Sequence, residues 1–478
     1  MRKFRLPHQT VWTQNMGKVQ IETVSRSGFV VSRASSNKKT LQASINTLPP
    51  ELLTEIFAYF LPTRDDVAMN STPDVPYLLT FLSVCKYWRH ASLRTPYLWS
   101  TILMVSPTLT RPDTMVKQWL ERSATHPLTL ILVLSPSSEE GVQDVDMLRG
   151  AVQALSTLTE HIHRWKSLDL RMSEFPTHSE HQFGLQLPSS LDAAPLLERV
   201  VVEEEYSLTG DEAESFWRTV GGYSAVRHAA WSTSLKGPRS CLPLFGTRWD
   251  KLTSLRSELT VDDHTLRYLS QCGSLEHLTV SILKNPSPGE VAPRRCYPLP
   301  QLRRLAITSY HSDRPLTLFL QSIEVPSLDD LELSGGWNSN KAWMDLFERS
   351  SCRLKTLWLC DDTFSGDAAP QCLSSPAVAD LKELTVQLIY EAEACFKFLT
   401  WTSEAEFLPV LRKIVIQTTS RFTIGQLERM LESRLEHPRN TLECASVHYL
   451  ERHYQQGELV FLDRLRNNGL NVEMVCID

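Results

Sequence analysis

Paired cysteines are missing from this chain of 478 residues. Its ten cysteines stand singly between Cys85 and Cys476, without a CxxC pair or any other close spacing. Small secreted domains carry frameworks of disulfide cysteines, and zinc modules need paired ligands, so the sequence favours neither class. We therefore expect free thiols in a reducing compartment.

Long apolar runs and phosphate-binding loops are also missing. No apolar run approaches the ~20 residues that a membrane-spanning helix requires. The glycine pairs Gly221-Gly222 and Gly335-Gly336 lack the following glycine or Lys-Ser of a nucleotide-binding loop. We expect no cofactor and no membrane contact.

Charge is unevenly distributed along the chain. The total of −6 gives no general case for nucleic-acid binding. Residues 1–40 hold eight basic side chains and one acidic side chain, a net of +7, which leaves −13 for the rest. This composition resembles a mitochondrial presequence, but the helical periodicity of such signals is poor here. We interpret residues 1–44 as a basic, flexible tail, and expect an intracellular protein of the cytoplasm, the nucleus or both.

Two helical runs lie between Leu48 and Trp99. Pro49, Pro50 and Glu51 stand where a helix begins, because proline there loses no helical hydrogen bond and the carboxylate complements exposed N–H groups. The first run has one broad apolar face, made of Leu52, Leu53, Ile56, Phe57 and Phe60. After a polar loop at 62–76, a second run carries Leu78, Leu79, Phe81, Leu82, Val84, Cys85 and Trp88. Thr95-Pro96 ends the second run, and we expect an extended segment from Leu98.

This apolar content exceeds what so short a segment can bury. A helical module of about 50 residues has too small a core for all of these side chains, and surplus apolar helix surface indicates a partner. The two runs, LPPELLTEIFAYFL and LSVCKYWRHASLRTPYLW, resemble an F-box. The family pattern begins with Leu-Pro, continues with Glu-Leu-Leu and Ile-Phe, and closes with Val-Cys-Lys, Trp-Arg and a terminal Trp. The loop between the runs is longer than in compact F-boxes.

The resemblance implies an F-box at residues 45–105. It also implies that this domain binds a Skp-family linker protein, which in turn sits on a cullin. The residues implied in that contact are Leu48, Pro49, Leu52, Leu53, Ile56, Phe57, Leu82, Val84, Cys85 and Trp88.

Leucine-rich hexamers recur in residues 106–478. The pattern LxxLxL begins, at intervals of 26–30 residues, at Leu275, Leu302, Leu328, Leu354, Leu381 and Leu411. Looser copies begin at Trp165, Leu197, Val226 and Trp249. This period is typical of leucine-rich repeats, in which each hexamer is a short strand with its leucines in a shared core. We expect Leu128–Leu134 to form the first rung, and Leu442–Tyr449 and Leu470–Ile477 to form the last rungs or a cap.

The segments between the hexamers complete the expected fold. Asp262–Gln271, Lys341–Arg349 and Phe422–Arg434 have the apolar spacing of helices, although no regular asparagine follows each strand. Stretches at 119–134, 161–170 and 194–202 also resemble fungal F-box proteins that join this box to an irregular solenoid. The sequence thus predicts an α/β fold: a small all-helical F-box, then a leucine-rich-repeat-like solenoid with parallel strands on the concave side and helices on the convex side.

The outward positions of the hexamers suggest a target-binding face. The candidate residues are Arg303, Arg304, Asp329, Asp330, Glu332 and Trp358. Two interpretations stay open. The charged bands pair with one another across the ~5 Å strand spacing, or they set specificity for a target that Trp358 anchors.

The resemblance to an F-box implies a non-catalytic adaptor of a Skp–cullin–F-box ubiquitin ligase, with an unknown protein as its target. The alternative is a repeat scaffold without a ligase role, in which the N-terminal helices cap the solenoid and bury Leu52, Leu53 and Ile56. An enzyme would need a convergent polar cluster that the sequence does not display. His161 and His163, or His178 and His181, would need a third ligand to hold a metal, and we expect none.

Overall fold

The structure is a computed structural model, and it divides into two compact units. The first unit holds the chain up to Thr101, together with the short segment Arg122–Ala124. The second unit holds Ile102–Glu121 and the chain from Thr125 onward. The sequence places the boundary between its expected domains at residue 105. The described residues are 45, 48–62, 77–105, 112–134, 143–172, 187–204, 210–233, 249–285, 295–308, 313–334, 340–361, 372–388, 392–401, 407–419, 422–437, 441–450 and 461–477. The expected basic tail at 1–44 and most of the loop at 62–76 lie outside them.

The first unit is helical. Its elements are α1 (Pro50–Ala58), α3 (Tyr77–Val84), α4 (Lys86–Leu93) and the 3₁₀ helix η2 (Pro96–Trp99). Pro50 opens α1, and the Leu53 N–H donates to the Pro49 carbonyl at 3.1 Å. The expectation of an extended segment from Leu98 is wrong, because Leu98 and Trp99 close η2 and the strand begins only at Thr101.

The second helical run is interrupted at Cys85. This residue has an extended backbone, with φ −158° and ψ 170°, and separates α3 from α4. Its Sγ accepts the N–H of Trp88 at 3.4 Å and so satisfies one of the free donors at the start of α4. Cys85 is therefore the N-cap of a new helix.

Aromatic side chains form the core of the first unit. The rings of Phe57 and Phe81 stack with centroids 4.4 Å apart, and the Trp88 ring lies 4.9 Å from Phe57. The Trp99 indole N–H donates to the Ser92 carbonyl at 2.9 Å, so this buried ring caps the end of α4. These contacts tie all the described helices of the unit together.

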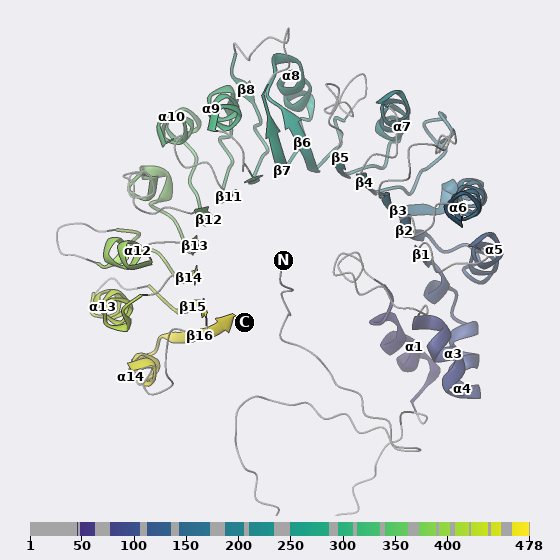
Figure 1. Cartoon of the computed structure of the whole chain (residues 1–478), viewed down its shortest axis with the longest axis horizontal. Helices are drawn as coiled ribbons and strands as arrows, with labels where there is room; N and C mark the ends of the chain where they lie inside the picture. The colour runs from purple at the N-terminus through teal and green to yellow at the C-terminus, as the bar shows by residue number, and fades with distance from the viewer. Residues whose placement is uncertain are drawn as a thin grey trace, which may run out of the picture. The chain divides into compact units, whose positions relative to one another are not determined.

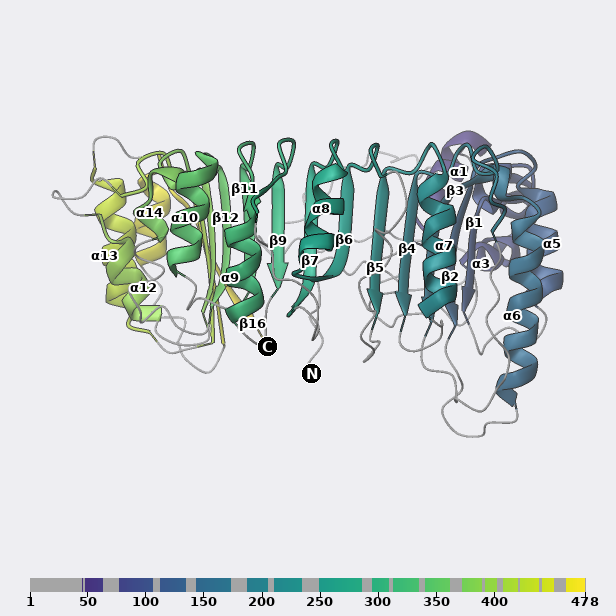
Figure 2. The ribbon, with the colours of Figure 1, turned by 90° about the horizontal axis from the view of Figure 1, so that it is seen from above.

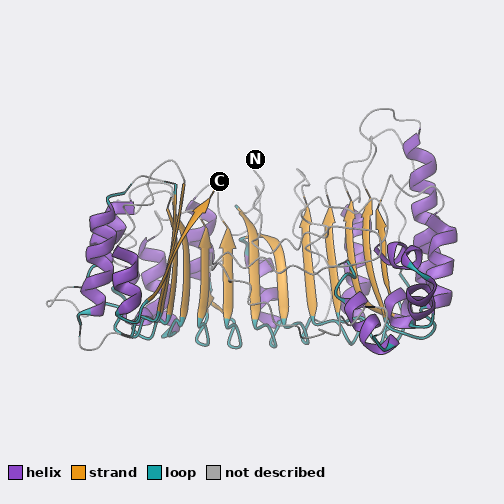
Figure 3. Ribbon diagram, turned by 90° about the horizontal axis from the view of Figure 1, so that it is seen from below, coloured by secondary structure: helices purple, strands orange, loops and turns teal. Residues whose placement is uncertain are grey.

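The second unit is built on a sheet of 14 strands in its described residues. Each neighbouring pair from β2 to β16 is parallel (Figure 3). The spatial order follows the sequence apart from the omission of β8 and β10. The strands are β1 (Thr101–Val105), β2 (Leu128–Leu134), β3 (Trp165–Met172), β4 (Arg199–Glu204), β5 (His228–Thr233), β6 (Ser254–Thr260), β7 (His277–Lys284), β9 (Arg304–Thr308), β11 (Asp330–Ser334), β12 (Thr356–Asp361), β13 (Glu383–Leu388), β14 (Lys413–Thr418), β15 (Cys444–Leu450) and β16 (Asn471–Ile477).

Helices cover one face of this sheet. Within the second unit the strands line the inner side of a curve and the helices lie outside them (Figures 1 and 2). The outer elements are α5 (Pro112–Arg122), α6 (Gln143–Thr159), η3 (Ile162–Arg164), α7 (Gly210–Gly222), α8 (Asp263–Gln271), α9 (Asp313–Ser322), α10 (Asn340–Ser350), η6 (Pro376–Val378), α12 (Ala392–Leu399), α13 (Ile424–Leu435) and α14 (Phe461–Asn467). Two short strands, β8 (Tyr297–Pro298) and β10 (Ile323–Glu324), pair in parallel apart from the large sheet. The predicted α/β solenoid is confirmed.

The hexamer leucines fill the core between the two layers. Leu305, Leu331, Leu357 and Leu384 are aligned on adjacent strands, and each is 0% exposed. Their partners two residues later in each strand are buried as well. No unit of this size buries such a row alone, so adjacent repeats depend on one another for stability.

Two expected rungs differ from the structure. The first strand of the sheet is β1 rather than β2, because the run after Trp99 already has the alternating burial of a rung. The copy assigned to Trp249 is three residues too early: Leu255 pairs with Leu278, which makes Leu252 the equivalent of Leu275. Trp249, Leu252 and Leu255 are spaced by three, so the pattern fits in two frames. The two C-terminal segments form the strands β15 and β16.

A backbone ladder runs along the start of the strands. The Glu276 carbonyl, directly before β7, accepts the N–H groups of Arg303 and Arg304 at 2.8 and 3.0 Å. The carbonyls of Arg303, Asp329, Lys355, Lys382 and Arg412 each accept two N–H groups from the next repeat in the same way. The backbone thus satisfies its own polar groups at this edge, where no asparagine ladder is needed. Most positions directly after the strands, where the sequence lacks the regular asparagine of leucine-rich repeats, lie outside the described residues.

Arginines connect neighbouring repeats in the helical layer. The Arg349 guanidinium, at the end of α10, donates to the carbonyls of Leu320 and Ile323 at 2.7 Å each. Arg434, in α13 and 2% exposed, donates to the Leu399 carbonyl at 3.0 Å, and burial lowers its pKa to about 10. The last carbonyls of a helix have no partner within the helix and carry negative partial charge, so a cation from the next repeat stabilises them.

Candidate partner-binding surfaces

Helix α1 is apolar on two different faces. Leu53 and Phe57 point into the first unit and are 0% and 1% exposed. Leu52 and Tyr59 are 48% and 89% exposed, and Ile56 between them is half-buried. Because residues four and seven apart share a helix face, Leu52, Ile56 and Tyr59 form an outer apolar stripe.

Helix α3 adds further exposed apolar side chains. Leu79 is 41% exposed and Val84 is 52% exposed, whereas Leu78 and Phe81 are buried. Leaving several large apolar side chains in water on so small a unit is typical of a surface that a partner covers.

The expected Skp-contact residues divide into three groups in the structure. Leu53 and Phe57 belong to the internal core, and Trp88 packs on Phe57. Pro49, Leu52 and Val84 are exposed. Leu48, Ile56, Leu82, Cys85 and Trp88 are half-buried. Which of these residues contact a partner stays a prediction.

The sequence-based set omits Tyr59 and Leu79. Tyr59 lies seven residues after Leu52, and this spacing alone places it on the same helix face. Leu79 lies next to the buried Leu78 in the sequence, and a run of adjacent apolar residues does not indicate which one faces outward.

The inner face of the repeat sheet carries regular rows of outward-facing side chains. The strand pairings align the first residue of each strand, which we call the first row: Arg304, Asp330, Thr356, Glu383 and Lys413. The second row lies two residues later and holds Ala306, Glu332, Trp358, Thr385 and Val415. The residues between the rows face the core, because side chains alternate along a strand.

Ion pairs between neighbouring strands use most of the expected target-binding charges. The Arg304 guanidinium lies 3.5 Å from the Asp330 carboxylate and 3.1 Å from that of Glu332. Lys355 Nζ lies 2.9 Å from the Asp329 carboxylate. Arg303 is exposed directly before β9. Charged side chains on neighbouring strands therefore pair with one another, as the first of the two interpretations expects. A role of the candidate residues in target binding stays a prediction.

Burial of Asp330 opposes its charge. Desolvation raises the pKa of this carboxyl, and the neighbouring Glu332 and Asp329 raise it further, while Arg304 and His277 lower it. The net direction is upward. The Arg304 charge thus offsets only part of the rise in the pKa of Asp330 that burial and the two neighbouring acids cause.

Trp358 is half-buried in the second row. Glu332 on β11 and Thr385 on β13 are its aligned neighbours, and Leu357 and Leu359 on either side of it are in the core. Its ring therefore belongs to the inner face of the sheet, as the hexamer pattern predicts. A half-exposed indole there is suited to cover an apolar group of a partner.

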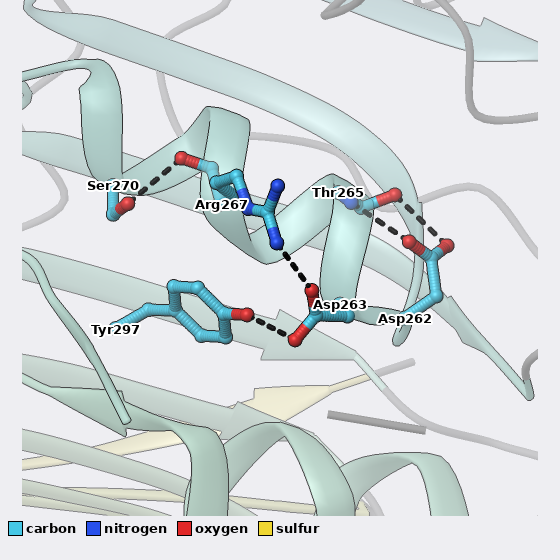
Figure 4. A network of polar contacts seen from close by, with 6 residues as sticks. All are labelled: Asp262, Asp263, Thr265, Arg267, Ser270 and Tyr297. Carbon is cyan, nitrogen blue, oxygen red and sulfur yellow. Dashed lines mark hydrogen bonds and ion pairs between the residues drawn. The ribbon is translucent and has the colours of Figure 1, made fainter. Parts of the chain in front are cut away.

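A network of polar contacts lies at the start of α8 and is structural. Asp262 caps the helix by accepting the Thr265 N–H at 2.7 Å (Figure 4). The next residue, Asp263, accepts hydrogen bonds from the Tyr297 hydroxyl and from Arg267, and the Tyr297 bond is the main cause that lowers the pKa of Asp263. Both carboxylates are fully engaged within the network, which fastens β8 to α8.

The histidine pairs and a membrane-spanning helix are the other features that the sequence leads us to consider. The described part of the chain contains no group of three or more His, Cys, Asp and Glu side chains arranged to hold a metal. The rings of His161 and His163 are 6.2 Å apart, and burial is the first cause that lowers the pKa of His161. His178 and His181 lie outside the described residues. Among the helices that the structure describes, none is long and apolar enough to span a membrane.

Comparison with known proteins identifies the first unit. Residues 45–104 match the model of the F-box-like family. No curated protein matches the chain. A crystal structure of a protein from Bacteroides fragilis is 13% identical, with a TM-score of 0.31 over 59% of this chain. The match spans 65% of that protein, and a likeness at this TM-score carries no argument. The chain thus consists of an F-box-like domain at residues 45–104 followed by a leucine-rich-repeat-like α/β solenoid.

Proposed function

We propose that this protein is the substrate-recognition adaptor of a Skp–cullin–F-box ubiquitin ligase. The match of residues 45–104 to the F-box-like family is the observation that carries the proposal, because this domain implies binding to a Skp-family protein. The adaptor itself performs no bond chemistry. It raises the effective concentration of target lysines near the ubiquitin carrier by holding both on one assembly. This role places the protein inside the cell.

The outer stripe on α1 supports docking to a partner. Within the first unit Leu52 is 48% exposed and Ile56 is half-buried, whereas Leu53 is in the core. The proposed docking surface is centred on Leu52, Ile56 and Val84, with Leu53 and Phe57 supporting it from the core.

The inner face of the repeat sheet is the proposed site for the target protein. The second row offers one half-exposed aromatic ring, Trp358, at its centre. Interfaces draw most of their binding energy from a few such anchors. The ion pairs around Arg304 then fix the shape of the surface beside the anchor.

Binding of the full chain to a purified Skp-family protein tests the proposal. We expect the Leu52→Glu/Val84→Glu variant to lose binding, because a charge in an apolar contact leaves a buried, unpaired carboxylate. Leu93→Glu is the matched control: Leu93 is 41% exposed on α4 and lies outside the proposed surface. Circular dichroism must report the same fold for all three proteins.

Absence of binding by the folded, unsubstituted chain would overturn the adaptor role. The repeat scaffold without a ligase would then take its place. Loss of binding in Leu93→Glu alone would instead move the docking surface to α4.

A further inference from the structure

An uncharged strip crosses the inner face of the sheet near its C-terminal end. In the second row it holds Trp358, Thr385, Val415 and Ser446 on the adjacent strands β12 to β15. None of these side chains ionises near neutral pH. The same row carries charges on both sides, at Glu332 on β11 and at Glu473 on β16.

The third row, two residues further along each strand, continues the strip. It holds Cys360, Gln387, Gln417 and His448 in register. Burial lowers the pKa of His448, against the effect of Glu473, so the imidazole is neutral at pH 7. The Ser446 hydroxyl and the His448 Nε2 lie 2.9 Å apart. Eight consecutive outward positions on four strands are therefore without charge.

The two acids that border the strip differ in their pairing. Glu332 lies 3.1 Å from the Arg304 guanidinium and forms an ion pair with it. Glu473 is exposed on β16, and no described basic side chain forms an ion pair with it. The first-row charges Glu383 and Lys413 pair with each other at 3.6 Å. Glu473 is thus an exposed carboxylate beside the strip that has no ion pair among the described basic side chains.

The polar side chains of the strip suit an extended backbone. Gln387 and Gln417 are aligned on neighbouring strands, and each amide both donates and accepts hydrogen bonds. The Thr385 hydroxyl does the same. An extended segment has free N–H and C=O groups to pair with them, whereas a helix has already used its own.

We propose that the strip binds an extended, uncharged segment of the target, with one apolar side chain against Trp358 and one Lys or Arg reaching Glu473. Four strand spacings of ~4.8 Å separate Trp358 from Glu473, about 19 Å in all. An extended chain covers about 3.3 Å per residue, so the basic residue lies about six positions from the apolar one. This inference rests on the proposed function and specifies the target class for the same face.

Selection of a displayed library of random 12-residue peptides on the full chain tests this inference. We expect enriched peptides to share an apolar residue, an uncharged stretch and a Lys or Arg about six positions away. Trp358→Ala should weaken an enriched peptide about tenfold or more. Glu473→Gln should remove the preference for the basic residue while leaving the uncharged stretch.

Two further variants provide a second test of the strip and a control on the same face. Gln417→Glu places a charge inside the strip with almost no change of shape, and should also weaken the peptide if Trp358→Ala fails to fold. Arg256→Ala removes an exposed charge from the same face on β6 and should leave binding unchanged. Enrichment of acidic or polybasic peptides, or no enrichment at all, would overturn the inference. So would binding of an enriched peptide by Trp358→Ala and Gln417→Glu that is as tight as binding by the unsubstituted chain.

Skp binding is measured on the same variants. All of them should bind the Skp-family protein as the unsubstituted chain does. Peptide binding without Skp binding would support the proposed target class and overturn the adaptor role. Skp binding without peptide binding would support the adaptor role and overturn the proposed target class.

Discussion

Leu52 and Leu53 are neighbours in the sequence and lie on different faces of α1. Leu53 is 0% exposed, packed in the core of the first unit, while Leu52 is 48% exposed. A helix turns by about 100° per residue, so two adjacent leucines of similar sequence context have different environments. The pair separates folding from docking within one turn of helix.

We expect Leu53→Ala to destabilise the first unit and Leu52→Ala to spare it. Truncating a buried leucine costs about 2–5 kcal/mol, because it leaves a cavity. Truncating the exposed leucine changes stability by about 0.5 kcal/mol or less but weakens Skp binding about tenfold. Urea unfolding and calorimetric binding measure the two effects. Equal losses of stability in both variants would mean that α1 is covered on both faces.

The sequence predicts the repeats well because their signal is purely one of burial. Leu305, Leu331 and Leu357 fill equivalent core positions, and equivalent positions demand equivalent side chains at a fixed period. The start of a repeat is misplaced at Trp249. There the apolar residues are spaced by three, so the LxxLxL pattern fits equally well when it begins at Trp249 or at Leu252.

Surface and capping details are less accessible from the sequence. The break at Cys85 depends on a thiol that accepts one N–H, which no periodicity reports. The pairing of Arg304 with Asp330 and Glu332 depends on strand register, and so does the uncharged strip. Candidate residues were predictable one by one, whereas their contacts required the structure.

Arg349 and Arg353 are four residues apart and should differ in their contribution to stability. The Arg349 guanidinium donates hydrogen bonds to the carbonyls of Leu320 and Ile323 in the preceding repeat. Arg353 pairs with Asp380 at 2.9 Å, with 70% of its side chain exposed. We expect Arg349→Ala to lower the free energy of unfolding by about 2–3 kcal/mol, and Arg353→Ala by about 0.5 kcal/mol or less. Chemical denaturation of both variants is the measurement, and a larger loss for Arg353→Ala would contradict the role given to Arg349.

Asp330 and Glu332 share the Arg304 guanidinium, and we expect opposite results from removing their charges. The folded state raises the pKa of Asp330, so its ionised form is disfavoured on folding at neutral pH. Asp330→Asn should therefore leave stability unchanged or raise it. Glu332→Gln keeps the shape but loses a pair at 3.1 Å, which costs up to about 1 kcal/mol. A clear loss of stability in Asp330→Asn at pH 7 would show that the Arg304 pair outweighs burial.

The stability of the C-terminal repeats should fall in mild acid through His448. Burial lowers the pKa of this imidazole below its ordinary value of 6.5, and Glu473 only partly opposes the shift. The unfolded chain then takes up a proton at higher pH than the folded chain does. The corresponding stability is complete above pH 6.5 and is lost as the pH falls from 6.5 through the lower folded pKa. Urea midpoints at pH 7.5 and 5.5 measure the loss, and His448→Gln should reduce it. His90→Gln is the control, since it removes an exposed imidazole on α4 of the first unit and no group of the C-terminal repeats. An equal loss in His448→Gln and the unsubstituted chain would assign the acid sensitivity to other groups, first of all to His161, whose pKa burial also lowers.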